Sequence, residues 1–326
     1  MRQKNLELQF LETLCRRTQL DTKEENQLYR LQQGFTGECQ VDQLIKRLPK
    51  HPFVLDDLNI QFGQKVTQID KLVLVGQTLY LLDVKDYQGK YTYQAGSWYH
   101  DGKILTGNIL SQIDRARDIL ARILLDNNLS LTIEPVIIFV NPAVQLEIDD
   151  PASHTIKRLG EFADWFEQRT TAHRDPAVEQ RLVVVLSKYQ IPAVAPKADF
   201  SQQTHRSLHP GICCPHCHNF ALVQKRYSLY CPRCRSFEPK EQAYVRTICE
   251  YGVLYFKQDL RRKELFAFFG EEYNRRYIEV CLKKFFKSSG FHGRSSYYIN
   301  EGQEFRYLFA NQMTYFKSLQ KRISWR

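Results

Sequence analysis

The chain has 326 residues, 43% of them hydrophobic, and a formal net charge of +10, and this length fits two or three domains that each bury a core. No apolar run approaches the roughly 18–20 residues that a membrane-spanning helix needs, and residues 1–7 lack the apolar stretch of a signal peptide. These features argue against a membrane-spanning helix, and we expect a cytoplasmic protein with no membrane partner.

The first fifty residues have helical patterns. Residues 1–20 alternate leucines with basic residues and predict a helix. Thr22-Lys-Glu-Glu25 fits a capping box, which predicts a helix from there to about Gln33. After Gly34 a second helix is expected, ending near Leu48.

One acid lies on the apolar stripe of that second helix. Glu38 stands three residues before Val41, so the two share a helix face. Such a carboxylate is either an acid near a helix start, stabilised by the helix dipole, or a buried ligand. The segment that follows favours the ligand.

A hairpin over residues 66–87 follows a strand expected at Phe53–Phe62. Both arms are rich in aliphatic and β-branched residues, and Gly76-Gln77 provides a tight turn. If the turn is centred there, Asp70 faces Asp83. Directly opposite like charges are unfavourable, so the pair requires a cation.

The environment of these acids decides between two interpretations. Asp70 and Asp83 can pair with Lys71 and Lys85 in a surface network. However, both faces of the hairpin are apolar, which is typical of central strands covered by helices, where an unpaired carboxylate is costly. Lys85 lies two residues after Asp83 and on the same face. A divalent metal held by oxygens beside a lysine is suited to attacking a phosphodiester.

The remaining elements of this half alternate between strands and helices. They are expected at Lys90–Tyr93, Ser97–His100, Asn108–Leu125, Ile133–Val140, Ile156–Gln168 and Pro176–Leu186. Gln112 lies near the start of the first of these helices. Its amide either reaches the metal site or is an ordinary solvated group.

Four short motifs of this region resemble a known family. Gly37-Glu38, Thr67–Asp70, Asp83–Lys85 and Tyr87–Gly89 are similar in order and spacing to the NERD (nuclease-related) domain of the PD-(D/E)xK nuclease superfamily, over a motif core of about 22–145. The resemblance implies an α/β fold with a restriction-endonuclease-like mixed sheet flanked by helices. It also implies nuclease activity.

The resemblance assigns roles to the motif residues. In this superfamily the helix glutamate and the two strand acids bind Mg²⁺, with Mn²⁺ an alternative, and the lysine positions or activates the attacking water. Two glutamines match further polar positions. The implied catalytic set is Glu38, Asp70, Asp83, Lys85, Gln68 and Gln112.

Residues 191–210 have the composition of a linker, with several prolines and polar residues. We therefore expect a first domain over 1–190, a zinc ribbon over 211–240 and a helical domain over 241–326. Residues 201–326 contain 22 Lys and Arg against 10 Asp and Glu, which suits nucleic acid. The alternative is scattered, solvated charge.

Cys214-Pro-His-Cys217 and Cys231-Pro-Arg-Cys234 are separated by thirteen residues. Two such knuckles place four sulfurs in the tetrahedral array that structural Zn²⁺ prefers. A redox motif is the alternative, and Cys213, His216 and His218 are nearby spare ligands.

Basic and aromatic residues lie between the two knuckles. Lys225 and Arg226, with Tyr227 and Tyr230, suit phosphate contact and base stacking. The segment is equally well a plain hairpin.

Three helices and a β wing are expected next, at Tyr244–Phe256, Asp259–Phe269, Glu272–Phe286 and Ser289–Ile299. This order resembles a winged helix-turn-helix, and a small helical interaction domain is the alternative. The basic residues of its recognition helix would be Arg275, Arg276, Lys283 and Lys284. A last helix repeats apolar residues from Phe305 to Ile323 and either packs internally or pairs two chains, so monomer and homodimer both stay open.

Together these features predict a metal-dependent nuclease that hydrolyses DNA and is targeted by its basic C-terminal half. One alternative is a non-catalytic DNA-binding or scaffold protein with an idle nuclease fold. Another is a nuclease that acts on RNA, because the tyrosines suit single strands of either polymer.

Overall fold

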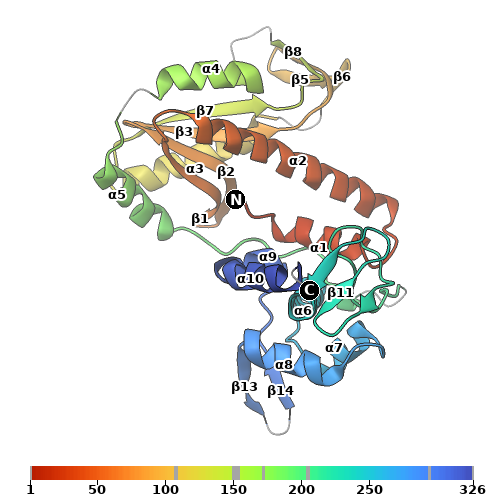
Figure 1. Cartoon of the computed structure of the whole chain (residues 1–326). Helices are drawn as coiled ribbons and strands as arrows, with labels where there is room; N and C mark the ends of the chain where they lie inside the picture. The colour runs from red at the N-terminus through yellow and green to blue at the C-terminus, as the bar shows by residue number, and fades with distance from the viewer. Residues whose placement is uncertain are drawn as a thin grey trace. The chain divides into compact units, whose positions relative to one another are not determined.

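The computed structural model describes residues 2–105, 109–148, 155–170, 173–202, 206–292 and 295–324. The chain divides into two compact units (Figure 1). We call the unit formed by Arg2 and Tyr29–Val194 the α/β unit. The other contains Gln3–Leu28 and Ala195–Arg326, and we call it the cysteine-rich unit. None of the described helices is both long and apolar enough to cross a membrane.

A five-stranded mixed sheet forms the centre of the α/β unit. Its strand order is β1-β2-β3-β7-β9, and the strands span Phe53–Phe62, Lys65–Val75, Thr78–Lys85, Thr132–Phe139 and Thr155–Arg158. The first three run antiparallel, and β7 and β9 join in parallel. The predicted mixed sheet is confirmed.

The hairpin of β2 and β3 has the predicted register. Val75 faces Thr78 and Leu72 faces Leu81, and the ladder ends with Lys71 opposite Leu82. Asp70 and Asp83 come directly after this last described pair, so they lie where the two strands separate. The hairpin therefore delivers both acids to the end of a rigid strand pair.

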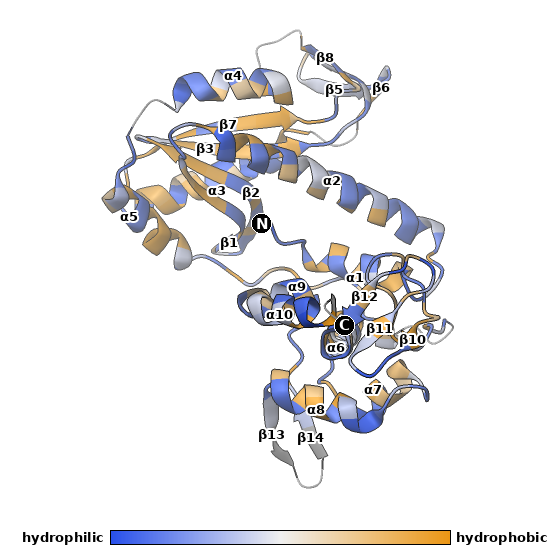
Figure 2. Cartoon of the chain, in the orientation of Figure 1, coloured by the Kyte–Doolittle hydropathy of each residue, from blue (hydrophilic) through white to orange (hydrophobic). Residues whose placement is uncertain are grey.

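Helices cover both faces of the sheet. On one face, α2 (Thr22–Arg47) and α4 (Leu159–Arg169) pack on the odd residues of β2 and the even residues of β3. On the other, α3 (Ser111–Asp126) and α5 (Pro176–Ser187) pack on the alternate set. Figure 2 shows the central strands, β7 above all, as hydrophobic and the surrounding helices as a mixture of hydrophilic and hydrophobic residues. This double burial is what the apolar faces of the hairpin predicted.

A second sheet extends this unit. Its order is β6-β5-β4-β8, with strands at Lys103–Ile104, Ser97–His100, Gly89–Gln94 and Val144–Ile148. Trp98 of β5 is buried and joins the core beneath α3. The two strands predicted at 90–93 and 97–100 are confirmed.

The prediction of two helices separated at Gly34 was wrong, because α2 is continuous from Thr22 to Arg47. A glycine costs a helix only about 1 kcal/mol, and tertiary packing outweighs that cost. The predicted cap was also one residue late. Asp21 accepts hydrogen bonds from the backbone of Lys23 and Glu24, and the Glu24 carboxylate accepts one from the Asp21 backbone.

The boundaries of two further elements of the α/β unit also differ from prediction. The segment from Ile156 begins as strand β9, and α4 starts only at Leu159. The first helical residue of α3 is Ser111, and the expected start, Asn108, lies outside the described residues.

The cysteine-rich unit begins with α1 (Leu6–Cys15) and a three-stranded antiparallel sheet, β10-β11-β12. These strands span Val223–Gln224, Ser228–Tyr230 and Phe237–Pro239. Three helices and a hairpin follow in the predicted order: α6 (Lys240–Leu254), α7 (Arg262–Phe269), α8 (Arg275–Phe285), β13 (Ser288–His292) and β14 (Ser295–Tyr298). Residues 293 and 294 of the expected wing, and 203–205 of the expected linker, lie outside the described residues.

The last predicted helix is interrupted. It consists of α9 (Phe305–Leu308), a 3₁₀ turn (Ala310–Gln312) and α10 (Met313–Ser324). Phe305, Phe309 and Phe316 are buried, and their rings lie against each other and against Phe285 of α8. The apolar repeat therefore packs internally, and the break lets its rings fold over one core.

A buried ionic network lies at the centre of the cysteine-rich unit. Glu250 of α6 is almost inaccessible and pairs with Arg17 and with Arg246, the latter at 2.5 Å. Arg17 also donates to the carbonyls of His209 and Gly211, at 3.1 and 3.0 Å. The network thereby joins the segment after α1, the segment that leads into the first cysteine knuckle, and α6.

Candidate active site and cysteine cluster

Asp70, Asp83 and Lys85 come together at the end of the β2–β3 hairpin. Lys85 Nζ lies 2.9 Å from Asp83 Oδ1, as their two-residue spacing predicts. The Val84 backbone donates a hydrogen bond of 3.4 Å to Asp70 Oδ2. The strand geometry therefore places two carboxylates and an ammonium in one cluster.

Burial and mutual attraction shift the pKa values of Asp83 and Lys85. Burial raises the pKa of Asp83 to about 7, although Lys85 opposes the shift. Burial lowers the pKa of Lys85, but Asp83, Tyr87 and Asp70 together raise it by more, so the net shift is upward. Lys85 is thus firmly cationic, while the charge on Asp83 is held against a desolvation cost.

The two predicted glutamines lie beside these acids. Gln112, in the first turn of α3, accepts a hydrogen bond of 3.3 Å from Lys85 Nζ. Gln68, Asp70, Asp83 and Gln112 line one small pocket, with Ile113 and Ala116 as its apolar wall. The pocket measures about 10 Å³, close to the space that a single water occupies.

Glu38 lies on α2 and faces a residue that the sequence did not indicate. Its Oε2 pairs at 2.6 Å with Nε of Arg2, whose side chain is buried. Burial raises the pKa of Glu38 to about 7, against the opposing effect of Arg2. The neighbouring Gly37 allows α2 to pack closely against Val140, because a Cβ at position 37 would lie 2.6 Å from Val140 Cγ2.

Arg2 also contacts further acids and a backbone carbonyl. Its Nη2 lies 2.7 Å from Asp57 Oδ1 and donates to the Asp70 carbonyl at 3.1 Å, and its Nη1 lies 3.3 Å from Asp42 Oδ1. Asp57 has a φ of +52°, uncommon for a residue other than glycine, and stands opposite Asp70 between two regular pairs of the β1–β2 ladder. The adjacent acids 56 and 57 in a strand were the sequence signal for this site. Arg2 had none.

The donor set fits a hard divalent cation. The carboxylate of Asp83 is buried. Its Oδ1 lies 2.9 Å from Lys85 Nζ, but its Oδ2 accepts no hydrogen bond from any residue that the structure describes, which is costly without a cation. Carboxylate oxygens are the ligands that Mg²⁺ and Mn²⁺ prefer. Glu38 does not form a compact ligand group with Asp70 and Asp83. Among the described residues, the group of three or more metal-ligand side chains that lie within 4.8 Å of one another consists of the four cysteines described below.

Comparison with known families gives one match. The nuclease-related domain family, NERD, matches residues 33–140, which include β1–β3, most of α2, α3 and β7. The α/β unit contains a nuclease-related domain. No curated protein and no solved structure matches the chain. The predicted resemblance is thus confirmed for this part of the chain, and the roles of individual residues in the nuclease-related domain stay predictions.

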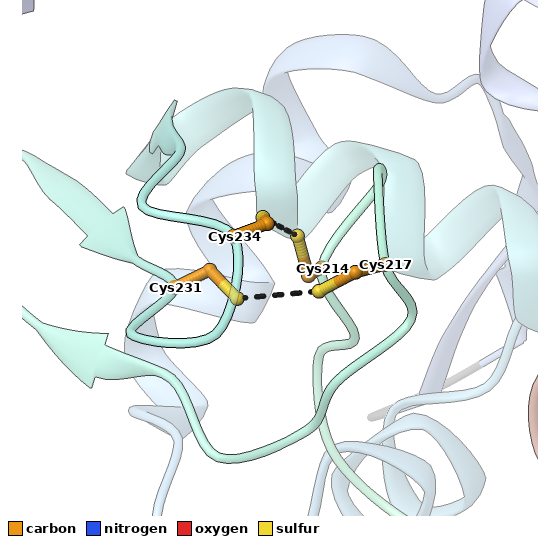
Figure 3. A group of neighbouring side chains, drawn as sticks. All are labelled: Cys214, Cys217, Cys231 and Cys234. Carbon is orange, nitrogen blue, oxygen red and sulfur yellow. Dashed lines mark hydrogen bonds between the residues drawn. The ribbon is translucent and has the colours of Figure 1, made fainter.

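The four predicted cysteines of the other unit converge (Figure 3). Their sulfur atoms all lie within 4.8 Å of one another, and Cys214 lies 3.5 Å from Cys234 and Cys217 3.4 Å from Cys231. Sulfurs on one tetrahedral zinc lie about 3.8 Å apart, given Zn–S bonds of about 2.3 Å. The cluster is therefore consistent with structural zinc. Cys213 is not part of it, since its sulfur faces Glu250 instead.

Ionisation of all four thiols in this cluster also requires a cation. Hydrogen bonds with Ser236 lower the pKa of Cys234 to about 6. The Asn219 backbone lowers the pKa of Cys217, but burial and the neighbouring sulfurs raise it by more, to about 12. Four thiolates can coexist here only with a metal that compensates their charge.

Replacing Cys231 with serine is expected to remove the zinc. Wild-type protein should carry about one zinc per chain, and the variant well below half of that, because three sulfurs bind zinc far more weakly than a closed set of four. Metal analysis of the purified chain measures this. Cys39→Ser, a cysteine of α2 outside the cluster, is the control and should keep its zinc. Full zinc content in the Cys231 variant would contradict a zinc site made of four cysteines.

The six basic residues predicted to bind nucleic acid are all exposed: Lys225, Arg226, Arg275, Arg276, Lys283 and Lys284. The first two lie on the turn between β10 and β11, and the others at the two ends of α8. Lys284 pairs with Glu241 at 2.5 Å, so part of its charge is already compensated. Nucleic-acid contact by these residues remains a prediction.

Proposed function

We propose that the protein is a metal-dependent nuclease that hydrolyses DNA phosphodiester bonds. The observation that carries the proposal is the buried Asp83 carboxylate, which has one oxygen 2.9 Å from Lys85 Nζ and the other without a hydrogen bond, inside a nuclease-related domain. A structural acid would be expected to have its oxygens satisfied. A buried carboxylate that has one unsatisfied oxygen and a lysine on the other suits a cation and an anionic substrate.

Asp70 and Asp83, with the Val84 carbonyl, would hold Mg²⁺ or Mn²⁺. Glu38 would join them only by exchanging its contact with Arg2. When bound, the metal supplies Lewis-acid polarisation of a phosphoryl oxygen and a lowered pKa of water.

Lys85 and the two glutamines would orient the attacking water and the substrate. Lys85 is held by Asp83 on one side and Gln112 on the other, so its ammonium can orient a water and stabilise charge that develops on the phosphate. Gln68 lines the same pocket and offers an amide for the substrate. The apolar wall of α3 limits the entry of other waters.

DNA is the proposed substrate because the cysteine-rich unit has a surplus of basic residues at exposed positions. Binding to phosphates by such residues is independent of sequence and falls with salt. Targeting by this unit and hydrolysis by the α/β unit would then be separate activities of one chain.

The test is cleavage of supercoiled plasmid, linear duplex, single-stranded DNA and RNA by the purified chain with Mg²⁺ or Mn²⁺. Cleavage of DNA is expected, with loss of activity in Lys85→Ala because no other described lysine contacts Asp83. Lys90→Ala removes an exposed lysine of the same domain and should keep activity. Binding without cleavage of any substrate would indicate an idle fold, and cleavage of RNA alone would indicate an RNA-directed enzyme.

A further inference from the structure

A groove crosses the cysteine-rich unit between the β10–β11 turn, β12, the start of α6, α8 and the end of α10. Its volume is about 1110 Å³, at or above the upper end of about 300–1,000 Å³ for small-molecule sites. Its walls come from segments almost a hundred residues apart. The size fits a stretch of polymer better than a small ligand.

The groove is strongly basic. Lys225 and Arg226 line it from the turn, Lys240 from α6 and Arg322 from α10. Glu241, the one acid among the described residues that line it, is already engaged, since one oxygen pairs with Lys284 and the other accepts the Tyr315 hydroxyl. The lining therefore carries a net positive charge and favours a polyanion.

Aromatic rings are placed among these cations. Tyr227 and Phe237 are 51% and 39% exposed, large fractions for such side chains. Lys225 Nζ lies 4.8 Å from the centre of the Phe237 ring, and Lys240 Nζ lies 5.8 Å from that of Tyr277. Alternating cations and exposed rings form the usual platform for phosphates and unstacked bases.

We propose that this groove binds single-stranded nucleic acid, with phosphates on the four cations and bases stacked on Tyr227 and Phe237. A duplex hides its base faces in its own stack and would use only the cations. An acidic peptide would also satisfy the charge but would leave the rings unused. The inference deepens the proposed function, because it names the form of nucleic acid that the nuclease would receive. Only this role in supplying substrate rests on the proposed function; the binding itself does not.

Binding is tested on the full zinc-loaded chain without added Mg²⁺, so that cleavage plays no part. Fluorescence anisotropy is measured with a labelled 12-nucleotide oligo-dT and with a duplex of equal length, across a range of salt concentrations. We expect tighter binding of the single strand. Tyr227→Leu and Phe237→Leu should each weaken it about tenfold or more and leave duplex binding nearly unchanged.

Charge and stacking are separated by the salt dependence. Arg322→Ala should lower the slope of log K against log salt by about 0.7 for the single strand, whereas the leucine variants should leave this slope unchanged. Tyr29→Leu, at a tyrosine outside the groove that is also more than half exposed, is the matched control and should bind as wild type. Zinc content and circular dichroism verify that each variant is folded.

Two results would overturn the proposal. One is equal affinity for single strand and duplex that neither leucine variant changes. The other is displacement of oligo-dT by poly-glutamate at equal charge concentration, which would make the groove a general anion site. The binding assay is separate from the cleavage assay, so the two proposals can fail independently. DNA cutting by a chain whose oligo-dT binding is not changed by the two leucine variants would reject this inference alone, and single-strand binding in the groove without any cutting would reject the proposed function alone.

Discussion

Replacing Asp83 with asparagine is expected to lower the rate of metal-dependent DNA cleavage by more than about 100-fold. Removing a residue that only hydrogen-bonds to a metal ligand typically lowers metal affinity or activity about 10–100-fold. Removing a ligand itself should lower activity by more. The amide keeps the size of the side chain but loses the charge that a divalent cation requires. Single-turnover cleavage of a labelled duplex at saturating Mg²⁺ measures the loss.

The same substitution should separate catalysis from folding. Because burial disfavours the charged form of Asp83, the neutral amide should not lower the melting temperature of the protein without Mg²⁺. Wild type should gain stability as Mg²⁺ or Mn²⁺ is added, and the variant should not.

Asp118→Asn makes the same change at an exposed acid of α3 and should retain both cleavage and stabilisation by metal. Near wild-type cleavage by the Asp83 variant would remove this residue from the catalytic set.

Replacing Glu250 with glutamine is expected to lower the free energy of unfolding of the cysteine-rich unit by about 3–5 kcal/mol, the usual effect of breaking a buried ion pair. Arg17 has no exposed side-chain area and Arg246 little, so the substitution leaves two cations with reduced compensation. Urea unfolding followed by circular dichroism measures the change. Glu272→Gln, at an exposed glutamate, should change stability by less than about 0.5 kcal/mol.

The effect of Glu250 should depend on pH in a defined direction. Burial alone would raise its pKa, but Arg17 and Arg246 lower it by more, to about 2, from an ordinary 4.5. The folded state therefore binds this proton less readily than the unfolded state. The stabilisation is complete above about pH 4.5 and is lost as the pH falls toward 2. The difference between wild type and Glu250→Gln should shrink over that range, and a constant difference would contradict the ionic explanation.

The sequence alone determined the features that depend on local pattern. Alternation of apolar residues and a single Gly-Gln turn specified the register that brings Asp70 and Asp83 to the end of the hairpin. Spacing of two residues specified the contact of Lys85 with Asp83. The paired cysteine knuckles specified their own cluster, because short turns leave their sulfurs few other arrangements.

Only the tertiary structure decided the features that join distant segments. Arg2 reaches Glu38 across 36 residues, and Arg17 reaches Glu250 across 233, and an ion pair at such separation leaves no periodic signal in a sequence. Gly34 ends no helix because packing of α2 on the sheet outweighs a small local preference. The basic and aromatic groove likewise exists only where α10 packs beside the β10–β11 turn and β12. Local chemistry can be read along the chain, but the partners of a buried charge are set by how the chain folds back on itself.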